Sequence, residues 1–428
     1  MEIKKGYKMT DVGVIPEDWE VKSIGELFSS LRSASITKEM FVEKGCMCVH
    51  YGDIHTKYGR ILDCDKDVIP NVPISLCKNY PNVEDGDIIM ADASEDLEGV
   101  GKCVSVINTR GRDIISGLHT ILLRDRNNSF YNSFPTYMFS CENVKKGIES
   151  YAVGTKVNSI SYNSIKDCQF CYPSKKEQQA IADALTKVDN LIMSLSKVIE
   201  KKKLIKKGAM QKLLSGEMRL DGFDVEWERK QIGKIGITYS GITGKNKSDF
   251  GHGTAKYITF LNVLNNPIIN TKELELVDIS SNENQNKALK GDLFFNVSSE
   301  TPEEVGICSV LLDDISNLYV NSFCFGFRIT DKEVSGIYLS YLFRTSLGRD
   351  KMSSIAQGAT RYNLSKDYFN EIELTIPPTK AEQTAIANIL TTMDNEIEAL
   401  EKERDKYKCI KQGMMQQLLT GKIRLTCQ

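Results

Sequence analysis

The sequence predicts an α/β chain of the α+β kind, with two globular domains joined by two long antiparallel coiled-coil helices in an internal pseudo-two-fold repeat. Three observations lead to this fold class. Residues 173–220 are repeated without a gap as residues 378–425, with about half of the positions identical. Both stretches have the pattern of one long helix. The regions before them contain short apolar runs broken by Gly, Asn and Asp, which is typical of strands.

Each repeated stretch begins and ends with helix signals. Residues 174–177 and 379–382 match a capping box, in which Ser or Thr is followed three residues later by Glu, directly after a proline. Gly216 and Gly421 close the stretches, and glycine readily ends a helix in the left-handed conformation. About 40 residues separate these signals, which corresponds to helices about 60 Å long.

Apolar residues recur along both helices at alternating spacings of four and three. They are Ile181, Leu185, Val188, Ile192, Leu195 and Ile199 in the first helix, and Ile386, Leu390, Met393, Ile397 and Leu400 in the second. This narrow stripe favours packing against another helix, and its period of about 3.5 predicts a left-handed supercoil. The simplest partner of each helix is the other one. Gly208 and Gly413 lie inside the helices at equivalent places, which either a close helix approach or a kink would explain.

Length and charge limit the class of protein. A chain of 428 residues can hold two or three domains, and its formal net charge of −2 means that any nucleic-acid binding uses local basic patches. The N-terminal residues lack a secretory signal and no apolar run approaches a membrane span, so we expect a cytoplasmic protein. In that compartment the twelve cysteines are expected to be reduced thiols.

Residue types that bind metals or cofactors do not form a convincing site. Cys168 and Cys171 have zinc spacing but stand alone, and we interpret them as strand cysteines. The carboxylates Asp92, Glu95, Asp96 and Glu98 could be imagined around Mg²⁺, but two of them recur in a loop of the second half that looks architectural. The run at residues 240–245 resembles a phosphate loop without its first glycine. We therefore predict no metal, no cofactor and no catalytic residues.

The duplication extends into the globular regions, although much of their sequence has diverged. The two tryptophans, Trp19 and Trp227, occupy matching places, and we expect them to anchor the first element of each core. Residues 86–88 match residues 291–293 at the same offset as the helices. Similar helices beside dissimilar globules suggest a common scaffold that presents two different readers, meaning two globules that each recognise a different target. DNA suits such a protein, because two half-sites on a duplex require two readers at a fixed separation.

The motifs resemble those of the specificity subunit of type I restriction–modification systems. They are the helix starts PxxxEQxxIAxxL, the helix ends LLxGxxRL, the PEDWE lead-in, and residues 51–58, 240–253 and 298–306. The resemblance covers essentially the whole chain. It implies a non-catalytic subunit in which each globule is a target-recognition domain for one half of a split DNA sequence. It also implies that the helices set the unread spacer and dock two methyltransferase (modification) subunits, which restriction–translocase subunits join.

This resemblance suggests domain boundaries and a set of DNA-binding residues. We expect target-recognition domains at residues 1–172 and 221–376, and spacer helices at 173–220 and 377–428. Polar loop residues suited to base or phosphate contacts are the candidates. They are His55, Thr56, Lys57, Tyr58, Arg60, Lys156 and Asn158 in the first globule, and Thr243, Lys245, Lys247, His252, Arg361, Tyr362 and Asn363 in the second.

Three alternatives remain at this stage. The lysines at residues 201–203, 206 and 207 could form a basic patch for DNA, although on a seam-forming helix a solvated face or a partner surface is the preferred interpretation. The chain could also be a free-standing DNA-binding regulator that uses the same two readers without methyltransferase partners. An enzyme with an unrecognised nuclease site is the least favoured interpretation.

Overall fold

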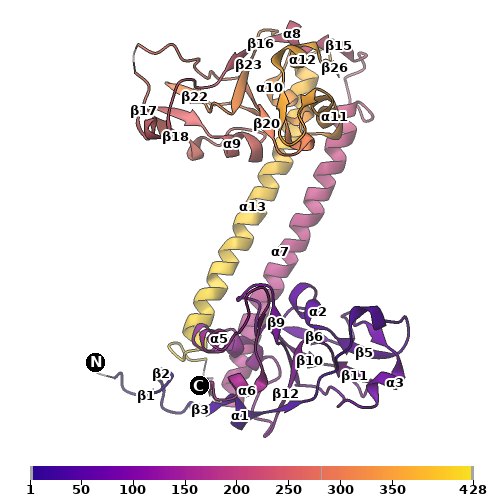
Figure 1. Ribbon diagram of the computed structural model, residues 1–428, viewed down its shortest axis with the longest axis vertical. Coiled ribbons are helices and arrows are strands. Elements are labelled where there is room, and N and C mark those ends of the chain that lie inside the picture. Colours follow the sequence, from indigo (N-terminus) through magenta and orange to yellow (C-terminus); the bar gives the residue numbers. More distant parts are fainter. Residues whose placement is uncertain (1–2, 281, 426–428) are drawn as a thin grey trace. The chain divides into compact units, whose positions relative to one another are not determined.

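The structure is a computed structural model that describes residues 3–280 and 282–425 (Figure 1). It divides into two compact units. The first unit contains Met1–Leu195 and Glu403–Gln428, and the second contains Ser196–Lys402. The helices α7 (Lys175–Ser215) and α13 (Lys380–Leu418) pass from one unit into the other. Each unit therefore holds one globule, the start of the helix that follows it, and the end of the other helix.

The first globule is built from short strands with small helices between them. Its elements are β1 (Tyr7–Thr10), β2 (Gly13–Pro16), β3 (Glu20–Ser23), α1 (Ile24–Leu27), β4 (Phe28–Leu31), η1 (Lys38–Met40), β5 (Cys46–Val49), α2 (Tyr51–Thr56), β6 (Ile61–Asp63), β7 (Asn71–Val72), α3 (Ile74–Cys77), β8 (Ile88–Ala91), β9 (Ala93–Ser94), β10 (Cys103–Ile107), β11 (Ile114–Ser116), β12 (Thr120–Asp125), α4 (Phe134–Phe139), α5 (Glu142–Glu149), β13 (Asn158–Ser159), α6 (Tyr162–Ile165) and β14 (Gln169–Tyr172). The main sheet has the order β4-β12-β8-β10-β6, and a second sheet has the order β11-β5-β7.

The second globule has a corresponding set of elements. They are β15 (Glu228–Gln231), α8 (Ile232–Ile235), β16 (Gly236–Ser240), η2 (Lys247–Asp249), β17 (Phe250–Ile258), α9 (Phe260–Asn265), η3 (Thr271–Glu273), β18 (Glu275–Val277), β19 (Leu293–Asn296), β20 (Ser298–Ser299), η4 (Pro302–Glu304), β21 (Cys308–Val310), β22 (Leu318–Val320), β23 (Cys324–Ile329), α10 (Gly336–Leu342), α11 (Ser346–Ser354), β24 (Ala356–Gln357), β25 (Tyr362–Leu364), α12 (Lys366–Glu371) and β26 (Glu373–Ile376). Its main sheet has the order β16-β23-β19-β21, its second sheet has the order β18-β17-β22, and β20-β25-β24 and β15-β26 form two further small sheets.

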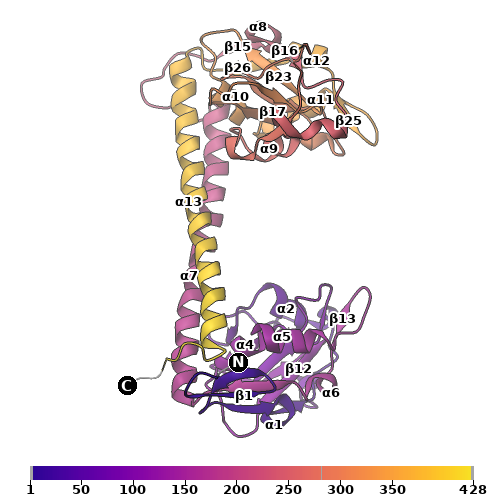
Figure 2. The same ribbon diagram turned by 90° about the vertical axis from the view of Figure 1, so that its left-hand side faces the viewer.

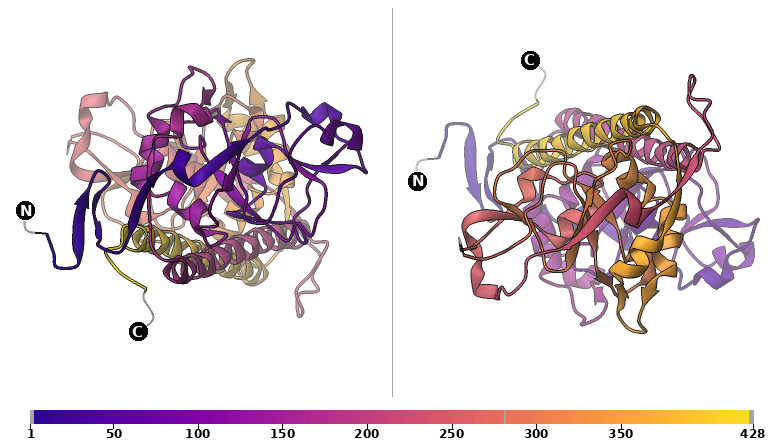
Figure 3. Two further views of the ribbon diagram at one scale, coloured as in Figure 1. Left: turned by 90° about the horizontal axis from the view of Figure 1, so that it is seen from below. Right: turned by 90° about the horizontal axis from the view of Figure 1, so that it is seen from above.

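The two globules share one topology despite their divergent sequences. Figure 3 draws the ribbon from both ends, coloured along the sequence. The order β4-β12-β8-β10 corresponds to β16-β23-β19-β21, and every pairing in these two series is antiparallel. The second sheets also agree. Strand β5 is parallel to β11 and antiparallel to β7, and in the same way β17 is parallel to β22 and antiparallel to β18. The internal repeat predicted from the helices therefore extends through the fold of the globules.

Each hydrophobic core combines a globule with both helices. In the first unit, Ile181 and Leu185 of α7 and Leu418 of α13 are buried with Trp19 and the aromatic residues of α4. In the second unit the equivalent residues Ile386 and Leu390 of α13 pack with Leu213 and Leu214 of α7 against that globule. The first two members of each predicted seam are therefore part of a globular core.

The rest of the seam lies between the paired helices. Ile199 and Ile397 are buried, whereas Val188, Ile192, Leu195, Met393 and Leu400 are partly buried. Ion pairs show that the helices are antiparallel. Asp189 binds Lys411 in the first unit, and in the second unit Lys206 binds Asp394 and Lys203 Nζ lies 2.6 Å from Glu401 Oε1. Lys202 likewise pairs with Glu396 at 2.6 Å, so three of the five clustered lysines face the partner helix.

The predicted helix ends are confirmed, but the capping boxes are only partly correct. The helices have 41 and 39 residues, and Gly216 and Gly421 follow them with φ of +79° and +68°. The Glu382 backbone N–H donates to Thr379 Oγ1 at 3.4 Å, as in a capping box. The carboxylates of Glu177 and Glu382, however, bind arginines from the end of the other helix instead of closing the box (described in the Discussion).

The helix glycines are not required by close packing. A Cβ on Gly208 or Gly413 would meet no atom within 4 Å outside its own helix, and both positions lie in uninterrupted helix. The structure therefore rules out close helix approach as the reason for these glycines.

The prediction of reduced cysteines is wrong for one pair. Cys46 and Cys77 form a disulfide, because the antiparallel pairing of β5 with β7 brings α3 beside the start of β5. The other nine cysteines within residues 3–425 are free thiols, and Cys427 lies outside the described residues. Cys171 lies in β14, where burial raises the pKa of its thiol to about 12. Within the same described residues, no helix has the length and apolar character needed to cross a membrane.

Candidate nucleic-acid interface

The first globule presents a hairpin, residues 153–159, beside its main sheet (Figure 2). Asn158 and Ser159 of β13 pair with Ser94 and Ala93 of β9. Gly154 has φ of +146°, and a Cβ at this position would lie 1.9 Å from the carbonyl oxygen of Val157. The turn therefore requires glycine, and it exposes the candidate Lys156 at its tip.

The second globule presents an equivalent hairpin, residues 356–364. Strand β25 carries the candidates Tyr362 and Asn363 and pairs with both β20 and β24. Gly358 has φ of +142°, and its Cβ would lie 2.0 Å from the carbonyl oxygen of Arg361. Arg361 and Asn363 are exposed, whereas Tyr362 is partly buried against the core.

The helix α2 places His55 next to the first hairpin. Its Nε2 atom lies 3.0 Å from the carbonyl oxygen of Ala93 in β9, the strand that pairs with β13. Two more histidines surround the neighbouring Tyr51, whose ring centroid is 4.7 Å from that of His50 and 5.2 Å from that of His119. Sequence reasoning missed Tyr51 and His119, because the turn before β12 that brings His119 to this place has no local sequence signal.

Charged groups complete this histidine cluster. His119 Nδ1 lies 3.2 Å from Asp92 Oδ1, and Lys102 Nζ donates to the His55 carbonyl oxygen at 2.8 Å. Burial raises the pKa of the Asp92 carboxyl above its ordinary value, while His119 opposes this shift. Burial also lowers the pKa of His50 and of Lys102. The cluster is thus partly desolvated and rich in groups that donate hydrogen bonds.

The other candidates of the first globule differ in accessibility. Thr56 and Lys57 are exposed, and Lys57 Nζ lies 2.8 Å from Asp53 Oδ1. Tyr58 is 6 % exposed and its hydroxyl donates to the Val68 carbonyl at 3.2 Å, so its side chain belongs to the core. Arg60 lies over the Tyr137 ring and 3.7 Å from Asp189 of α7, where it connects the globule to the helix.

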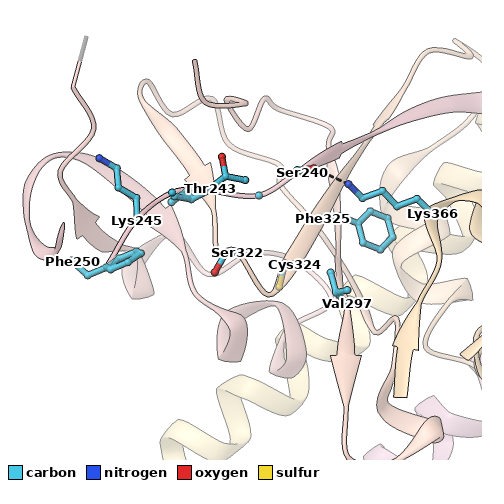
Figure 4. A pocket seen from close by; sticks show the side chains of 12 residues that line it. Ser240, Thr243, Lys245, Phe250, Val297, Ser322, Cys324, Phe325 and Lys366 are labelled. Atoms are coloured by element: carbon cyan, nitrogen blue, oxygen red, sulfur yellow. Dashed lines mark hydrogen bonds between the residues drawn. The ribbon is translucent and has the colours of Figure 1, made fainter. Parts of the chain in front are cut away.

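A cleft of about 440 Å³ opens beside the loop that follows β16 in the second globule (Figure 4). Thr243 and Lys245 line it together with Phe250. Lys366, which begins α12, lines the opposite side and donates to Ser240 Oγ at 2.8 Å. Sequence reasoning missed Lys366, since it lies 126 positions from its partner.

One amide side chain, Gln285, and one carboxylate, Glu283, hold this loop in place. Gln285 accepts from the Thr243 N–H at 3.1 Å and donates to the Thr243 carbonyl at 2.8 Å. Lys245 Nζ lies 2.5 Å from Glu283 Oε1, and this hydrogen bond holds the pKa of the Glu283 carboxyl at about 2. The remaining candidates, Lys247 in η2 and His252 in the irregular start of β17, are exposed.

The arrangement is suited to binding rather than to a recognisable reaction. In the part of the chain that the structure describes, no three His, Cys, Asp or Glu side chains gather in a way that could hold a metal ion. Each globule offers a hairpin, and lysine, histidine, arginine and amide side chains that are exposed or partly buried stand near the hairpins and in the loops. Such groups contact phosphates and base edges.

Comparison with known proteins identifies the family to which the whole chain is similar. A family described as the type I restriction modification DNA specificity domain matches twice, at residues 16–206 and 224–406. The chain is 28 % identical to the putative type I restriction enzyme MjaX specificity subunit of Methanocaldococcus jannaschii, with 99 % of this chain and 97 % of the relative covered. It is 24 % identical to the MjaVIII specificity subunit of the same organism, covering 96 % and 94 % of the two chains.

Two solved structures share the fold. The type I restriction-modification S subunit from M. genitalium aligns with a TM-score of 0.58 and 16 % identity over 98 % of each chain. A chain from a study of complex assembly and conformational transition of the type I system aligns with a TM-score of 0.54 and 15 % identity, covering 96 % of this chain and 99 % of that one.

Proposed function

Because the chain belongs to the type I restriction modification DNA specificity family, we propose that it is the DNA-recognition subunit of a type I restriction–modification complex. In this role it reads a bipartite DNA target, one half with each globule. The observation that carries the proposal is the double family match at residues 16–206 and 224–406. Each match spans one globule and much of the long helix that follows it, and the two globules have the same strand order.

The repeat also supports a specific set of partners. Two similar helices offer two equivalent surfaces, which fits the docking of two methyltransferase subunits, one for each repeat. Restriction–translocase subunits would join this assembly. The chain itself supplies no catalytic group and acts in the cytoplasm, where its partners and the DNA are found. We assign residues 1–172 and 221–376 to the target-recognition domains, and 173–220 and 377–428 to the spacer helices.

Most of the candidates that are exposed or partly buried are retained as DNA contacts. These are His55, Thr56, Lys57, Lys156, Asn158, Thr243, Lys245, Lys247, His252, Arg361, Tyr362 and Asn363. Tyr58 and Arg60 are left out, because the first is buried and the second connects its globule to α7. The alternative of a free-standing regulator is not favoured, since the relatives are named as specificity subunits of restriction enzymes.

Reconstitution tests this proposal. The purified chain with S-adenosylmethionine, ATP and Mg²⁺ should neither methylate nor cut DNA. Co-expressed with a methyltransferase subunit of its own system, the chain should co-purify with that subunit and direct methylation to one split sequence. Stoichiometric methyl transfer by the chain alone, or sequence-independent methylation by the complex, would contradict the proposal.

A further inference from the structure

We propose that the two equivalent hairpins read DNA bases by different chemistry. Val153 and Val157 of the first globule contact thymine methyl groups, whereas Gln357 and Arg361 of the second hydrogen-bond to purine edges. This inference rests on the proposed function and names the bases that one element of each globule recognises.

The backbones of the two hairpins are the same. Gly154 and Gly358 both adopt φ near +145°, and in each case the glycine faces the carbonyl oxygen of the residue three positions later. Both hairpins pair with the short strand that follows the central strand of the main sheet, β9 in one globule and β20 in the other. The residues on either side of the turn, 153 and 157 in one and 357 and 361 in the other, therefore occupy equivalent positions.

The side chains at these equivalent positions have opposite character. Val153 is 74 % exposed and Val157 is 51 % exposed. Gln357 and Arg361 are also exposed, but they are polar. Valine has few rotamers, so two valines on a fixed turn present a rigid apolar surface to solvent. If the hairpin contacts DNA, as the proposed function requires, apolar groups of the bases can cover this surface, and that burial would be favourable.

Base edges in the major groove match these two surfaces. Thymine is the base that presents a methyl group there, and apolar side chains contact it. Guanine presents two acceptors that suit an arginine, and adenine presents a donor and an acceptor that suit a glutamine. The half-site read by the first globule is therefore expected to contain an A·T pair. That read by the second is expected to contain a G·C pair for Arg361 and an A·T pair for Gln357. Lys156, at the first tip, is placed to contact a phosphate.

Uracil substitution tests the first hairpin without changing the protein. The complex with its methyltransferase subunit is titrated onto duplexes in which single thymines of the recognised sequence are replaced by uracil, which removes only the methyl group. We expect the affinity to fall by about fourfold when one or two particular thymines of the first half-site are replaced. This is the change in affinity that corresponds to the burial of one methyl group. The Val153→Ala/Val157→Ala complex should bind thymine and uracil duplexes equally. Wild-type binding that ignores uracil, or a variant that discriminates as wild type does, would overturn the proposal.

Substitution tests the second hairpin. Arg361→Ala should relax the preference at one base pair of the second half-site by a factor of about 5 to 150, as expected for the loss of a bidentate contact. Lys156→Ala is the matched control, because losing a phosphate contact should weaken binding to all sequences equally. All of these residues are exposed, so the variants should unfold at the wild-type temperature. An Arg361→Ala complex that methylates the unchanged motif with unchanged selectivity would refute the assignment.

The two levels of the argument can fail separately. If the wild-type complex recognises no split sequence, the proposed function is wrong. If it recognises one, but uracil and the hairpin variants leave selectivity unchanged, only the hairpin assignment is wrong.

Discussion

Replacing Arg424 should destabilise the first unit, because this residue neutralises a buried carboxylate. The Glu177 side chain is 2 % exposed and accepts from Arg424 Nε at 2.7 Å and Nη2 at 2.8 Å. Its other neighbour is the Leu425 N–H at 3.3 Å. Glu177 lies in the first turn of α7 and Arg424 lies after the end of α13, so the pair joins the two antiparallel helices at their ends. Glu177 and Asp18 hold the pKa of Arg424 above its ordinary value, which keeps the guanidinium charged.

The size of the effect follows from this burial. Removing one partner of a buried ion pair costs about 3–5 kcal/mol, since the other charge is left without compensation. The bonds to Asp18, whose side chain is 62 % exposed, add at most about 1 kcal/mol. In a unit of roughly 200 residues, 1 kcal/mol shifts Tm by about 2–4 °C. Arg424→Met should therefore lower the Tm of the first unit by about 6–24 °C.

Calorimetry of the full chain provides the assay and its internal control. Arg219 binds Glu382 in the second unit through the same two nitrogens, at 2.8 and 3.0 Å, so Arg219→Met should destabilise that unit instead. The double variant Glu177→Gln/Arg424→Met should be more stable than Arg424→Met alone, because it leaves no buried charge. A drop in Tm below about 2 °C for Arg424→Met, or a double variant less stable than the single one, would refute the reasoning.

Three further predictions concern the helices and the first globule. Gly208→Ala and Gly413→Ala should each stabilise the chain by about 0.5–1 kcal/mol in urea unfolding, because the added methyl meets no neighbour; a loss of stability would show a hidden constraint. Burial lowers the pKa of His50 below its unfolded value of about 6.5, so its neutral form stabilises the first unit. That stability should fall as the pH drops below about 6.5, and His50→Asn should flatten the Tm–pH curve; an unchanged curve would be evidence against it. Inserting four residues after Val198 in α7 and after Lys402 in α13 adds about 6 Å to each helix and should lengthen the unread DNA spacer by one or two base pairs. An active variant with the old spacer would show that the helices do not set the distance.

The long helices could be predicted because their signals are local. The terminal glycines, the 3.5-residue period and the repeat itself all lie within one stretch of sequence, and each appears in the structure where it was expected. The glutamates of the capping boxes show the limit of such signals. Glu177 and Glu382 have the spacing of a box, but an arginine more than 160 positions away in the chain binds each carboxylate more strongly than a backbone N–H would.

The candidate site was less predictable, since it depends on strand pairing. Arg60 and Lys156 look alike in sequence as basic loop residues, yet the first lies over Tyr137 and the second stands at a hairpin tip. Two further features also depend on strand pairing. Lys366 reaches the cleft through the pairing of β25 with β20, and the disulfide forms through the pairing of β5 with β7. Residues 154–161 and 358–365 are related in sequence, and their shared glycine geometry shows that both stretches form the same hairpin.

The most direct test of two independent readers is the methylated motif of a complex whose second globule has been exchanged. Residues 221–376 would be replaced by the matching region of a related specificity subunit, and the methylated sequence would be determined across a host genome. The account predicts a split motif in which one half changes to that of the donor, while the other half and the spacer length stay the same. A motif in which both halves change together, or a continuous motif, would contradict it.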